Sequence, residues 1–496
     1  MSDQSAITLL MDTASATHER GALAEADALY RRVLNQEPAH AEAIRRRVVI
    51  AHQNGVPENA LPVLDAAIRA DSANPAWPMG RALVLVSLGR HQEALAAYDH
   101  AIALQPDAHS PHHGRAATLM ALNRFEDALA GFTMAVALKP DAVESHTGRG
   151  GALWRLHRFQ EAMAAYDRAI EIQEDCAEAW FAKGLLLLLL GHYKEGWELH
   201  EWRHWLPGEA DQQRLFRQPA WDGAAFHGQM LLLHAEQGLG DTIQFHRFVA
   251  MAQRLGGVTV EVQAPLVRLL AAQPNAPLVI ARGQPLPRFD AQYPLMSLPL
   301  LFGTELHAIP TAPFYLQADP ALAATWVSRL PPPVPGTLRV GIAWSGNPTA
   351  AHNHNRSLPL TTMLAMFGPE TAVISLQKDM TPEDRATLSR TVSVTDLGGA
   401  LTDMADTAAV ISQLDLVISV CTSVAHLAGA LGKPVWVLLA ADADWRWLVD
   451  RADSPWYPTA HLFRQSKPGD WNSVAERVRR ALEDRRALNN QRGLEE

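Results

Sequence analysis

The sequence predicts an α-helical repeat array followed by two α/β domains. Alanine recurs every 34 residues through the first two hundred positions, which indicates repeated helical units. Beyond residue 230, short apolar runs alternate with segments of helical period, which is typical of α/β folds. A proline-rich stretch at 331–336 divides this second part. The expected domains are therefore residues 1–205, 206–335 and 336–496.

The composition restricts the class of protein. The chain of 496 residues carries a net charge of −10 and a pI near 6.1, which argues against a general nucleic-acid binder. Its two cysteines, Cys176 and Cys421, lie far apart without metal-ligand spacing, which excludes a disulfide scaffold and favours a reducing compartment. No leader-like pattern opens the sequence, and its most apolar run, 185–190, is far shorter than the roughly 20 residues that span a bilayer. We expect a cytoplasmic protein without a transmembrane segment.

The repeats share several positions. The register alanine is followed four residues later by a bulky residue and three further on by a smaller one, and proline closes three units. In turn these residues are Ala26, Ala60, Ala94, Ala128 and Ala162; Tyr30, Leu64, Tyr98, Phe132 and Tyr166; Val33, Ala67, Ala101, Ala135 and Ala169; and Pro38, Pro106 and Pro140. Small residues let antiparallel helices approach closely, and the bulky residue fills the space beside them. The pattern resembles the tetratricopeptide repeat, whose arrays commonly bind a peptide or protein in a concave groove.

The array is expected to end near Trp205. The segment 196–205, GWELHEWRHW, is rich in aromatic residues and lacks the composition of a flexible linker. It predicts a rigid junction that packs the last repeat against the α/β part of the chain. Three histidines of the array, His100, His112 and His113, have no companion ligands that would indicate a metal site.

Strands and helices alternate through the second part. Strands are expected at 230–237, 258–263, 277–281, 338–344, 372–378, 416–418 and 435–439. Helices are expected at 243–257, 264–273, 382–390, 402–414, 424–431 and 471–488. Ligands of open α/β sheets bind at the carboxyl ends of strands, so polar residues that come directly after these strands are candidate site residues in a cleft between the two domains.

The segment 414–439 reads as a strand, a polar turn, a helix and a strand. Its turn carries Cys421, Thr422 and Ser423 where the helix begins, and backbone N–H groups at such a position attract a phosphate. The alternative is an ordinary crossover whose helix has a Ser/Thr N-cap. His426, on the first helical turn, either reaches the ligand or is structural. Cys421 has no obvious partner base that would make it a nucleophile.

A glycine turn with Gly238, Gly240 and Asp241 comes after the first strand of the α/β part. The glycines allow close backbone approach. Asp241 is a candidate general base for an acceptor hydroxyl, and the alternative is a helix N-cap aspartate, which contributes roughly 1 kcal/mol.

The loop 345–357 comes directly after another strand. Arg356 is a candidate for holding a diphosphate leaving group, because its planar fork matches phosphate oxygens; the alternative is a loop arginine paired with a surface carboxylate. Ser345 and Asn347 are expected to contact the donor. His352 and His354, without a third ligand, are a weak metal signal.

The segment 441–448, ADADWRWL, comes after the last strand of the crossover. Asp444 and Arg446 are expected at the mouth of the cleft, as part of the donor site. Trp445 and Trp447 either stack on a base or sugar or belong to the core, and the core is the commoner place for tryptophan.

Together these segments resemble glycosyltransferases of the GT-B fold. HAEQGLGDTIQF (234–245), AWSGNPTAAHNHNRSLPL (343–360) and DLVISVCTSVAHLAGALGKPVWVLL (415–439) are similar to bacterial proteins that join tetratricopeptide repeats to a domain related to lipopolysaccharide heptosyltransferases. This resemblance covers nearly the whole chain. The layout also resembles the protein O-GlcNAc transferases, which place such repeats before a GT-B enzyme.

The resemblance implies roles for individual residues. Asp241 takes the place of the family's base, and Arg356 that of a basic residue that contacts the donor phosphates. The family motif D-T-x-x-x-H-L-A, which binds donor phosphate and sugar, reads C-T-S-V-A-H-L-A at 421–428. Cys421 replaces the aspartate, and a thiol is a poor acceptor for sugar hydroxyls, which argues against a heptose-like donor.

The resemblance thus implies an inverting, metal-independent glycosyltransferase that uses a nucleotide-sugar donor and no further cofactor. Its repeats would recruit a protein acceptor, with flagellin or another surface protein as candidates. Two alternatives stay open: a non-catalytic repeat scaffold whose α/β domains bind a nucleotide sugar, and a transferase that acts on glycans or lipopolysaccharide.

Overall fold

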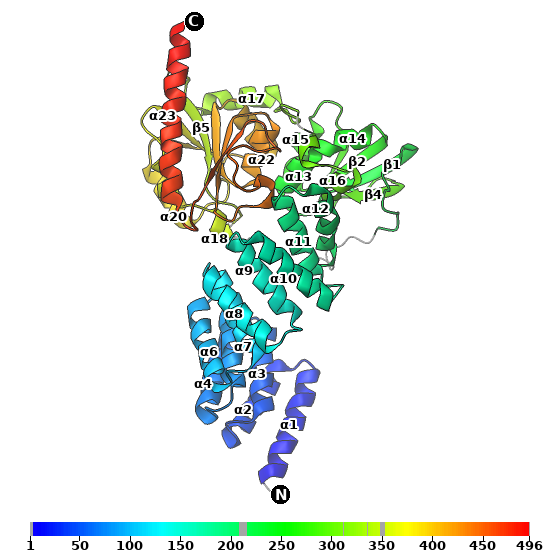
Figure 1. Ribbon diagram of the computed structural model, residues 1–496, viewed down its shortest axis with the longest axis vertical. Coiled ribbons are helices and arrows are strands. Elements are labelled where there is room, and N and C mark those ends of the chain that lie inside the picture. The colour runs from blue at the N-terminus through cyan, green and yellow to red at the C-terminus, as the bar shows by residue number, and fades with distance from the viewer. Residues whose placement is uncertain (1–2, 208–215, 311, 335, 348–352, 496) are drawn as a thin grey trace. The chain divides into compact units, whose positions relative to one another are not determined.

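The computed structural model describes residues 3–207, 216–310, 312–334, 336–347 and 353–495. Contacts divide the chain into two compact units, Met1–Ala182 and Lys183–Glu496. The first unit is a helical array, and the second contains two parallel sheets (Figure 1). This is the predicted fold class, a tetratricopeptide-repeat array followed by two Rossmann-like domains.

The first unit consists of helices that pack as antiparallel neighbours along the chain (Figure 1). Its elements are α1 (Asp3–Glu19), α2 (Leu23–Gln36), α3 (Ala41–Gln53), η1 (Pro57–Asn59), α4 (Ala60–Ala70), α5 (Ala76–Ser87), α6 (His91–Leu104), α7 (His109–Ala121), α8 (Phe125–Leu138), α9 (Val143–Arg155) and α10 (Phe159–Ile172). The next helix, α11 (Ala177–Leu189), spans the boundary between the units.

The repeated positions form the core of the array. Each register alanine is fully buried, and each bulky residue four positions later is at most 2% exposed. The turns between paired helices need left-handed backbone, which glycine adopts at Gly21, Gly55 and Gly89. Asn123 and His157 take the same conformation at the equivalent positions of the next two repeats, so the turn persists there without glycine.

The second unit begins with the end of α11, α12 (Tyr193–His200) and η2 (Glu201–Trp205). Its first sheet has the parallel order β3-β2-β1-β4. The strands are β1 (Phe226–His234), β2 (Gly256–Val262), β3 (Leu278–Ala281) and β4 (Ala291–Pro294). The helical segments around them are α13 (Leu239–Phe245), η4 (His246–Phe248), α14 (Val249–Gln253), η5 (Ala264–Leu266), α15 (Val267–Ala271), η6 (Leu295–Ser297), α16 (Leu298–Leu301), η7 (Leu306–Ala308), α17 (Pro320–Trp326) and η8 (Val327–Arg329).

The second sheet has the parallel order β10-β9-β8-β5-β6-β7. Its strands are β5 (Leu338–Ala343), β6 (Thr371–Ser375), β7 (Val394–Asp396), β8 (Leu416–Val420), β9 (Val435–Leu439) and β10 (Ala460–Arg464). The chain runs outward from β5 to β7 and returns to β8 on the other side, which is the strand order of a dinucleotide-binding fold. The topological switch point therefore lies between β5 and β8, where such sheets bind ligands.

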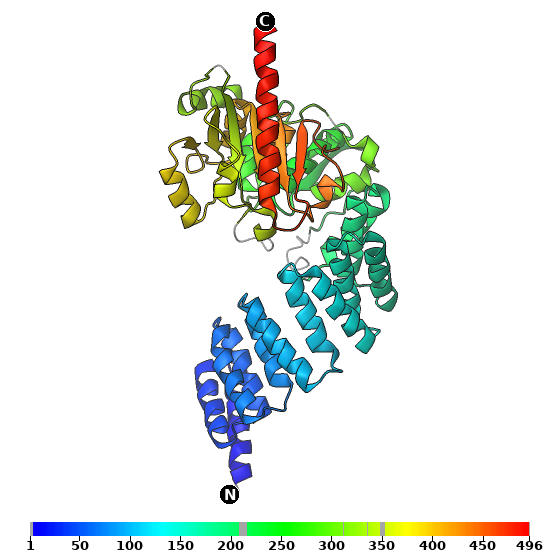
Figure 2. The same cartoon turned by 60° about the vertical axis from the view of Figure 1, so that its left-hand side comes forward.

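Helices cover the second sheet. They are α18 (Asn353–Arg356), α19 (Leu360–Leu364), α20 (Pro382–Arg390), α21 (Met404–Ser412), α22 (Ser423–Ala430), η9 (Trp445–Trp447) and α23 (Trp471–Glu495). The long C-terminal helix α23 crosses one face of the sheet (Figure 2), where Val474, Val478 and Leu482 join the buried cluster of Val340 and Ile418.

The aromatic segment 196–205 packs against the α/β part, as the sequence predicts. Trp197 on α12 lies edge-on to Trp445, with ring centroids 5.3 Å apart, and its Nε1 donates to the Thr304 carbonyl at 3.0 Å. Tyr193 stacks on Trp456 and accepts a hydrogen bond from its Nε1 at 3.0 Å. The helix α12 thus shares a core with the two sheets.

Polar contacts hold the two sheets together. Arg268 on α15 forms ion pairs with Asp403, the N-cap of α21, and with Asp406 on α21, at 2.7 and 2.6 Å. The backbone N–H groups of Tyr315 and Leu316 both donate to the Ala430 carbonyl, at 3.0 and 3.1 Å. These contacts fix the relative position of the two strand edges that face the cleft.

Several elements differ from the sequence expectation. The glycine turn 238–242 is the beginning of helix α13, with Gly238 as its N-cap. The reason is Asp241, whose carboxylate accepts from the Gly238 N–H at 2.8 Å and so stabilises the first turn. Asp241 is therefore the third helical residue and not the N-cap. The short strands β4, β7 and β10 were not expected, because they lack long apolar runs.

The glycines of α9 provide a test of the close packing. A Cβ at position 148 would lie 2.5 Å from Phe132, whereas one at 151 would contact only Met120, at 3.9 Å. Gly148→Ala is expected to destabilise the array by about 1–3 kcal/mol through overpacking. Gly151→Ala, on the same helix, should stabilise it by about 0.5–1 kcal/mol, because alanine is the better helix former.

The measurement is the midpoint of urea unfolding followed by helical circular dichroism. Equal midpoints for the two variants would show that helices α8 and α9 are less closely packed than the structure has them.

Candidate functional site

A cavity of about 710 Å³ lies at the carboxyl ends of the strands of both sheets. Its volume is within the range of small-molecule sites. Every residue that the sequence singles out for the site lines it: Gly238, Gly240, Asp241, Ser345, Asn347, Arg356, Cys421, Thr422, Ser423, His426, Asp444 and Arg446. Residues from four separate segments of the chain therefore converge on one place. Which part of a ligand each of them would hold stays a prediction.

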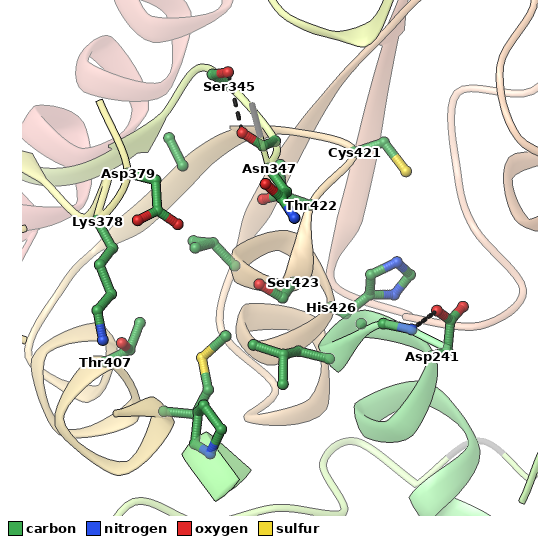
Figure 3. A pocket seen from close by; sticks show the side chains of 18 of the residues that line it. Asp241, Ser345, Asn347, Lys378, Asp379, Thr407, Cys421, Thr422, Ser423 and His426 are labelled. Atoms are coloured by element: carbon green, nitrogen blue, oxygen red, sulfur yellow. Dashed lines mark hydrogen bonds between the residues drawn. The ribbon is translucent and has the colours of Figure 1, made fainter. Parts of the chain in front are cut away.

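The first turn of α22 forms the centre of this cavity. Thr422 is the N-cap residue and has extended backbone, but its side chain caps no helical N–H. Its Oγ1 instead pairs with the Ser419 hydroxyl at 3.0 Å. The first N–H groups of a helix lack acceptors one turn earlier. That of Ala425 donates to the Thr422 carbonyl at 3.1 Å, and those of Ser423 and Val424 are available to an anion next to the hydroxyls of Thr422 and Ser423. Figure 3 shows these hydroxyls with Lys378 and Asp379 to one side and Asp241 and His426 to the other.

The loop after β5 is held by Gln377, which the sequence did not single out. Its Oε1 accepts from the backbone N–H groups of Trp344 and Ser345, both at 3.1 Å, and its Nε2 donates to the Ser345 carbonyl. Gln377 is buried at the end of β6. Its position near the carboxyl end of the predicted strand 372–378 was the only signal that could have identified it.

Arg356 folds over the same loop. A Cβ on Gly346 would lie 2.8 Å from the Arg356 Nε, so glycine makes this close approach possible. The Arg356 Nε donates weakly to the Asn353 side chain at 3.3 Å. Within the described residues no carboxylate pairs with Arg356, which leaves its guanidinium available to a negatively charged ligand. The alternative for Arg356, an ion pair with a surface carboxylate, is therefore not found among those residues.

Lys378 brings a second positive charge to the cavity. It is exposed, and its Nζ donates to the Thr402 carbonyl at 2.8 Å. The sequence places it at the end of the predicted strand 372–378, but its charge was not used in identifying the site. Neighbouring Asp379 is also exposed and lines the cavity, so this edge can contact both phosphate and hydroxyl groups.

Arg446 and Asp241 form an ion pair across the two sheets. Arg446 is only 7% exposed. Its Nη2 donates to Asp241 on α13, its Nη1 lies 3.0 Å from Asp444, and its Nε donates to Gln244 at 2.5 Å. Burial alone would lower the pKa of Arg446, but Asp444 and Asp241 outweigh it and raise that pKa. The guanidinium is therefore permanently charged and already neutralised by two carboxylates.

This pairing bears on the expected roles of three residues. The second oxygen of Asp241 accepts from Gly238, so both oxygens of its carboxylate have defined partners. Asp444 is exposed at the mouth of the cavity. The role of Arg446 in binding a sugar donor stays a prediction. In the structure its guanidinium contacts protein side chains.

His426 is a buried residue at the contact between α13 and α22. Its Nδ1 lies 2.8 Å from the Tyr457 hydroxyl, and its ring stacks on Trp447. Burial lowers its pKa well below the usual value, with Arg446 adding to the effect, so the ring is neutral at pH 7. A Cβ on Gly240 would lie 2.8 Å from this ring, and the glycine thus lets the two helices meet. The structural alternative for His426 has direct support.

Cys421 has the properties of a structural thiol. Trp447 donates its Nε1 to the Cys421 sulfur at 3.1 Å. Burial raises the pKa of the thiol to about 11, with a smaller contribution from Asp444. The thiol is therefore protonated at neutral pH, and a protonated thiol is a poor nucleophile. Trp445 and Trp447 are both buried, which places them in the core.

Neither a metal cluster nor a bilayer-spanning helix occurs in the part of the chain that the structure describes. Across those residues no three His, Cys, Asp or Glu side chains are grouped so that they could hold a metal ion. His352 lies outside the described residues. Among the described helices, none has the length and apolar character needed to cross a bilayer.

Comparison with known proteins supports the repeat array. A family model for the tetratricopeptide repeat matches residues 12–75, 57–109 and 113–175. Protein FlbA of Caulobacter vibrioides is 29% identical over 327 residues, which are 60% of this chain and 53% of FlbA. The chain thus spans about half the length of this relative.

Solved structures resemble a part of the chain. The MamA protein is 19% identical with a TM-score of 0.31, over 35% of this chain and 94% of MamA. YrrB, described as a TPR protein with an unusual peptide-binding site, is 22% identical with a TM-score of 0.31, over 36% of this chain and 91% of YrrB. PilF of Pseudomonas aeruginosa is 16% identical with a TM-score of 0.35, over 42% of this chain and 97% of PilF.

The buried histidines make the second unit sensitive to acid. Burial lowers the pKa of His246 to about 4, while unfolded histidine has a pKa near 6.5. Between these values the unfolded chain binds a proton that the native chain does not. The free energy of unfolding is therefore expected to fall as the pH drops below about 6.5, by up to ~1.4 kcal/mol per pH unit for this group.

Urea unfolding followed by tryptophan fluorescence at pH 7.5, 6.5 and 5.5 measures this slope. His246→Leu should make the slope shallower, whereas His307→Leu should not, because the His307 side chain is 81% exposed. An unchanged slope in His246→Leu would contradict the neutral, buried state of His246.

Proposed function

We propose that this protein is a glycosyltransferase that moves a sugar from a nucleotide-sugar donor to a protein acceptor. The observation that carries the proposal is the cavity at the switch point of the second sheet, which places the start of α22 and Arg356 opposite a carboxylate from the first sheet. An anion site and a candidate base on facing sheets are what transfer from a phosphate-linked sugar requires.

The donor phosphates would lie at the start of α22. Hydrogen-bond donors at this place come from three sources. They are the free N–H groups of the first helical turn, the hydroxyls of Thr422 and Ser423, and the Arg356 guanidinium. Lys378 adds a charge at the same edge. These groups stabilise the negative charge that develops on the leaving phosphate, which is the main requirement when the glycosidic bond breaks.

Asp241 would act as the base. The acceptor hydroxyl oxygen forms the new bond to the anomeric carbon, and its proton passes to the Asp241 carboxylate. The bond from the anomeric carbon to the phosphate oxygen breaks, and its electron pair leaves with the nucleotide. One displacement inverts the anomeric configuration. Arg446 and the Gly238 N–H orient the carboxylate during this step.

The repeats would supply the acceptor. Tetratricopeptide arrays present extended surfaces that suit a protein or peptide partner, and the family model covers most of residues 12–175. The similarity to FlbA is compatible with an acceptor among bacterial surface proteins, flagellin included, as the sequence resemblance implies.

A second candidate is a binding module without turnover. Cys421 favours it, because a protonated thiol that already accepts a hydrogen bond from Trp447 is a much poorer acceptor for sugar hydroxyls than an aspartate. The Arg446 ion pair also occupies one oxygen of the proposed base. The two candidate functions differ in one testable respect. Asp241 should set the rate of sugar transfer in a glycosyltransferase, whereas a binding module has no such rate.

Asp241→Asn tests the catalytic role. The amide keeps the size of the side chain but cannot take a proton, so transfer should slow by about 10²–10⁴-fold while donor affinity stays within a few-fold. Asp319→Asn is the matched control, because Asp319 caps helix α17 and asparagine caps equally well. The measurement is nucleotide release from a panel of nucleotide sugars, together with the dissociation constant of the best donor. A donor that binds to both variants but is never transferred or hydrolysed by the wild type would support the binding module.

Arg356→Gln tests the phosphate site. Loss of one charge-assisted hydrogen-bonding group of about 1.5–3 kcal/mol should weaken binding of the donor, or of its free nucleoside diphosphate, by about 10–100-fold. Arg385→Gln is the control, since Arg385 is exposed on α20 away from the cavity. Calorimetric titration with each nucleotide decides the matter, and equal affinities in the two variants would place the phosphates elsewhere.

A further inference from the structure

A second periodic feature runs through the repeat array, this time of charged residues. Arginine recurs every 34 residues, once on each of the helices α3, α5, α7 and α9. The first three reach back to an aspartate on the preceding helix. The pairs are Arg47 with Asp27 at 2.6 Å, Arg81 with Asp65 at 2.8 Å, and Arg115 with Asp99 at 2.7 Å.

The fourth arginine, Arg149, lacks this partner. Asp65 and Asp99 are one repeat apart, and the next position in that series is Thr133. The Thr133 hydroxyl donates to the Leu129 carbonyl of its own helix at 2.7 Å. Within the described residues Arg149 has no hydrogen bond or ion pair, and its Nε is buried without a partner. The nearby Glu161 is bound to Arg158 at 2.6 Å.

An unsatisfied arginine of this kind has a physical cost. A buried donor that loses its bond to water and gains no other forfeits part of its solvation. The pairs of Arg81 with Asp65 and of Arg115 with Asp99 show that a carboxylate fits beside this position in the two preceding repeats. At Arg149 the same space is bounded by a threonine, which is smaller and uncharged, so a carboxylate from outside can enter it.

We propose that Arg149 and the gap at Thr133 form a binding position for a carboxylate of a partner protein, presented by an aspartate, a glutamate or the chain terminus of an acidic segment. The planar guanidinium matches a carboxylate in two parallel hydrogen bonds. Met134, adjacent to Thr133 and 48% exposed, offers the segment an apolar contact. The partner carboxylate takes the place that Asp65 and Asp99 fill in the preceding repeats.

This inference deepens the recruiting role proposed above, but it depends on no catalytic step. Its test reads binding alone, so a failure here and a failure of the transferase proposal are distinguishable.

The experiment uses the full chain and an immobilised library of random 12-residue peptides. The wild type should enrich peptides with aspartate or glutamate, and replacing the key acid by its amide in the best peptide should weaken binding at least 10-fold. Arg149→Gln should cause a similar loss. Thr133→Asp should also cause it, because the new aspartate completes the internal pair and occupies Arg149.

Arg115→Gln is the matched control, since Arg115 already pairs with Asp99, and it should keep the wild-type affinity. Circular dichroism melting confirms that each variant is folded, and Thr133→Asp should melt no lower than the wild type. The proposal is overturned if the library shows no acidic enrichment, if Thr133→Asp binds the acidic peptide as tightly as the wild type, or if Arg115→Gln loses affinity as Arg149→Gln does.

Discussion

The buried charge of Arg446 is the constraint on which the second unit depends. A guanidinium withdrawn from water costs several kcal/mol unless opposite charges and hydrogen bonds compensate it. Here the compensation comes from both sheets, through Asp444 beside it and through Asp241 and Gln244 on α13. Wide separation of the two Rossmann-like domains would therefore remove Asp241 and Gln244 from that charge and leave it with Asp444 alone. The ion pairs of Arg268 with α21 and its N-cap act in the same direction.

The same constraint links stability to the proposed chemistry. The carboxylate that faces the cavity is also part of the bridge between the domains, so its orientation is set before any ligand arrives. Preorganised groups of this kind contribute to catalysis because they need little rearrangement at the transition state. The neutral His426 ring and the protonated Cys421 thiol belong to the packing that supports this arrangement, and neither carries a charge that would compete for the ligand.

Much of the fold could be predicted from the sequence, since periodicity reports directly on packing. The alanine register identified the array because close helix contacts tolerate only small side chains there, and the apolar runs identified the central strands. Short edge strands such as β7 were not predicted, because three residues are too few to show an apolar run or an alternation of apolar and polar residues. The helical start at Gly238 was not predicted either, since glycine favours turns and the cap comes from the carboxylate of Asp241.

The site residues could be located from the sequence, but the contacts between them could not be predicted. Their position after strands predicted that Asp241, Arg356 and Thr422 would converge, because parallel strands end at one edge. The partners of each side chain depend on distances across the cleft, which no local pattern encodes, so Gln377 and Lys378 were noticed only in three dimensions.

The aromatic contacts of α12 define where this protein can be divided. Trp197 and Tyr193 are buried against Trp445 and Trp456, and Trp445 directly precedes Arg446. A cut at residue 205 would expose these rings to water, whereas the compact second unit already begins at Lys183. Repeat arrays change length in whole units because each repeat contacts only its neighbours. Evolution or engineering can therefore lengthen, shorten or replace the array before that point while the core shared by α12 and the two sheets stays intact.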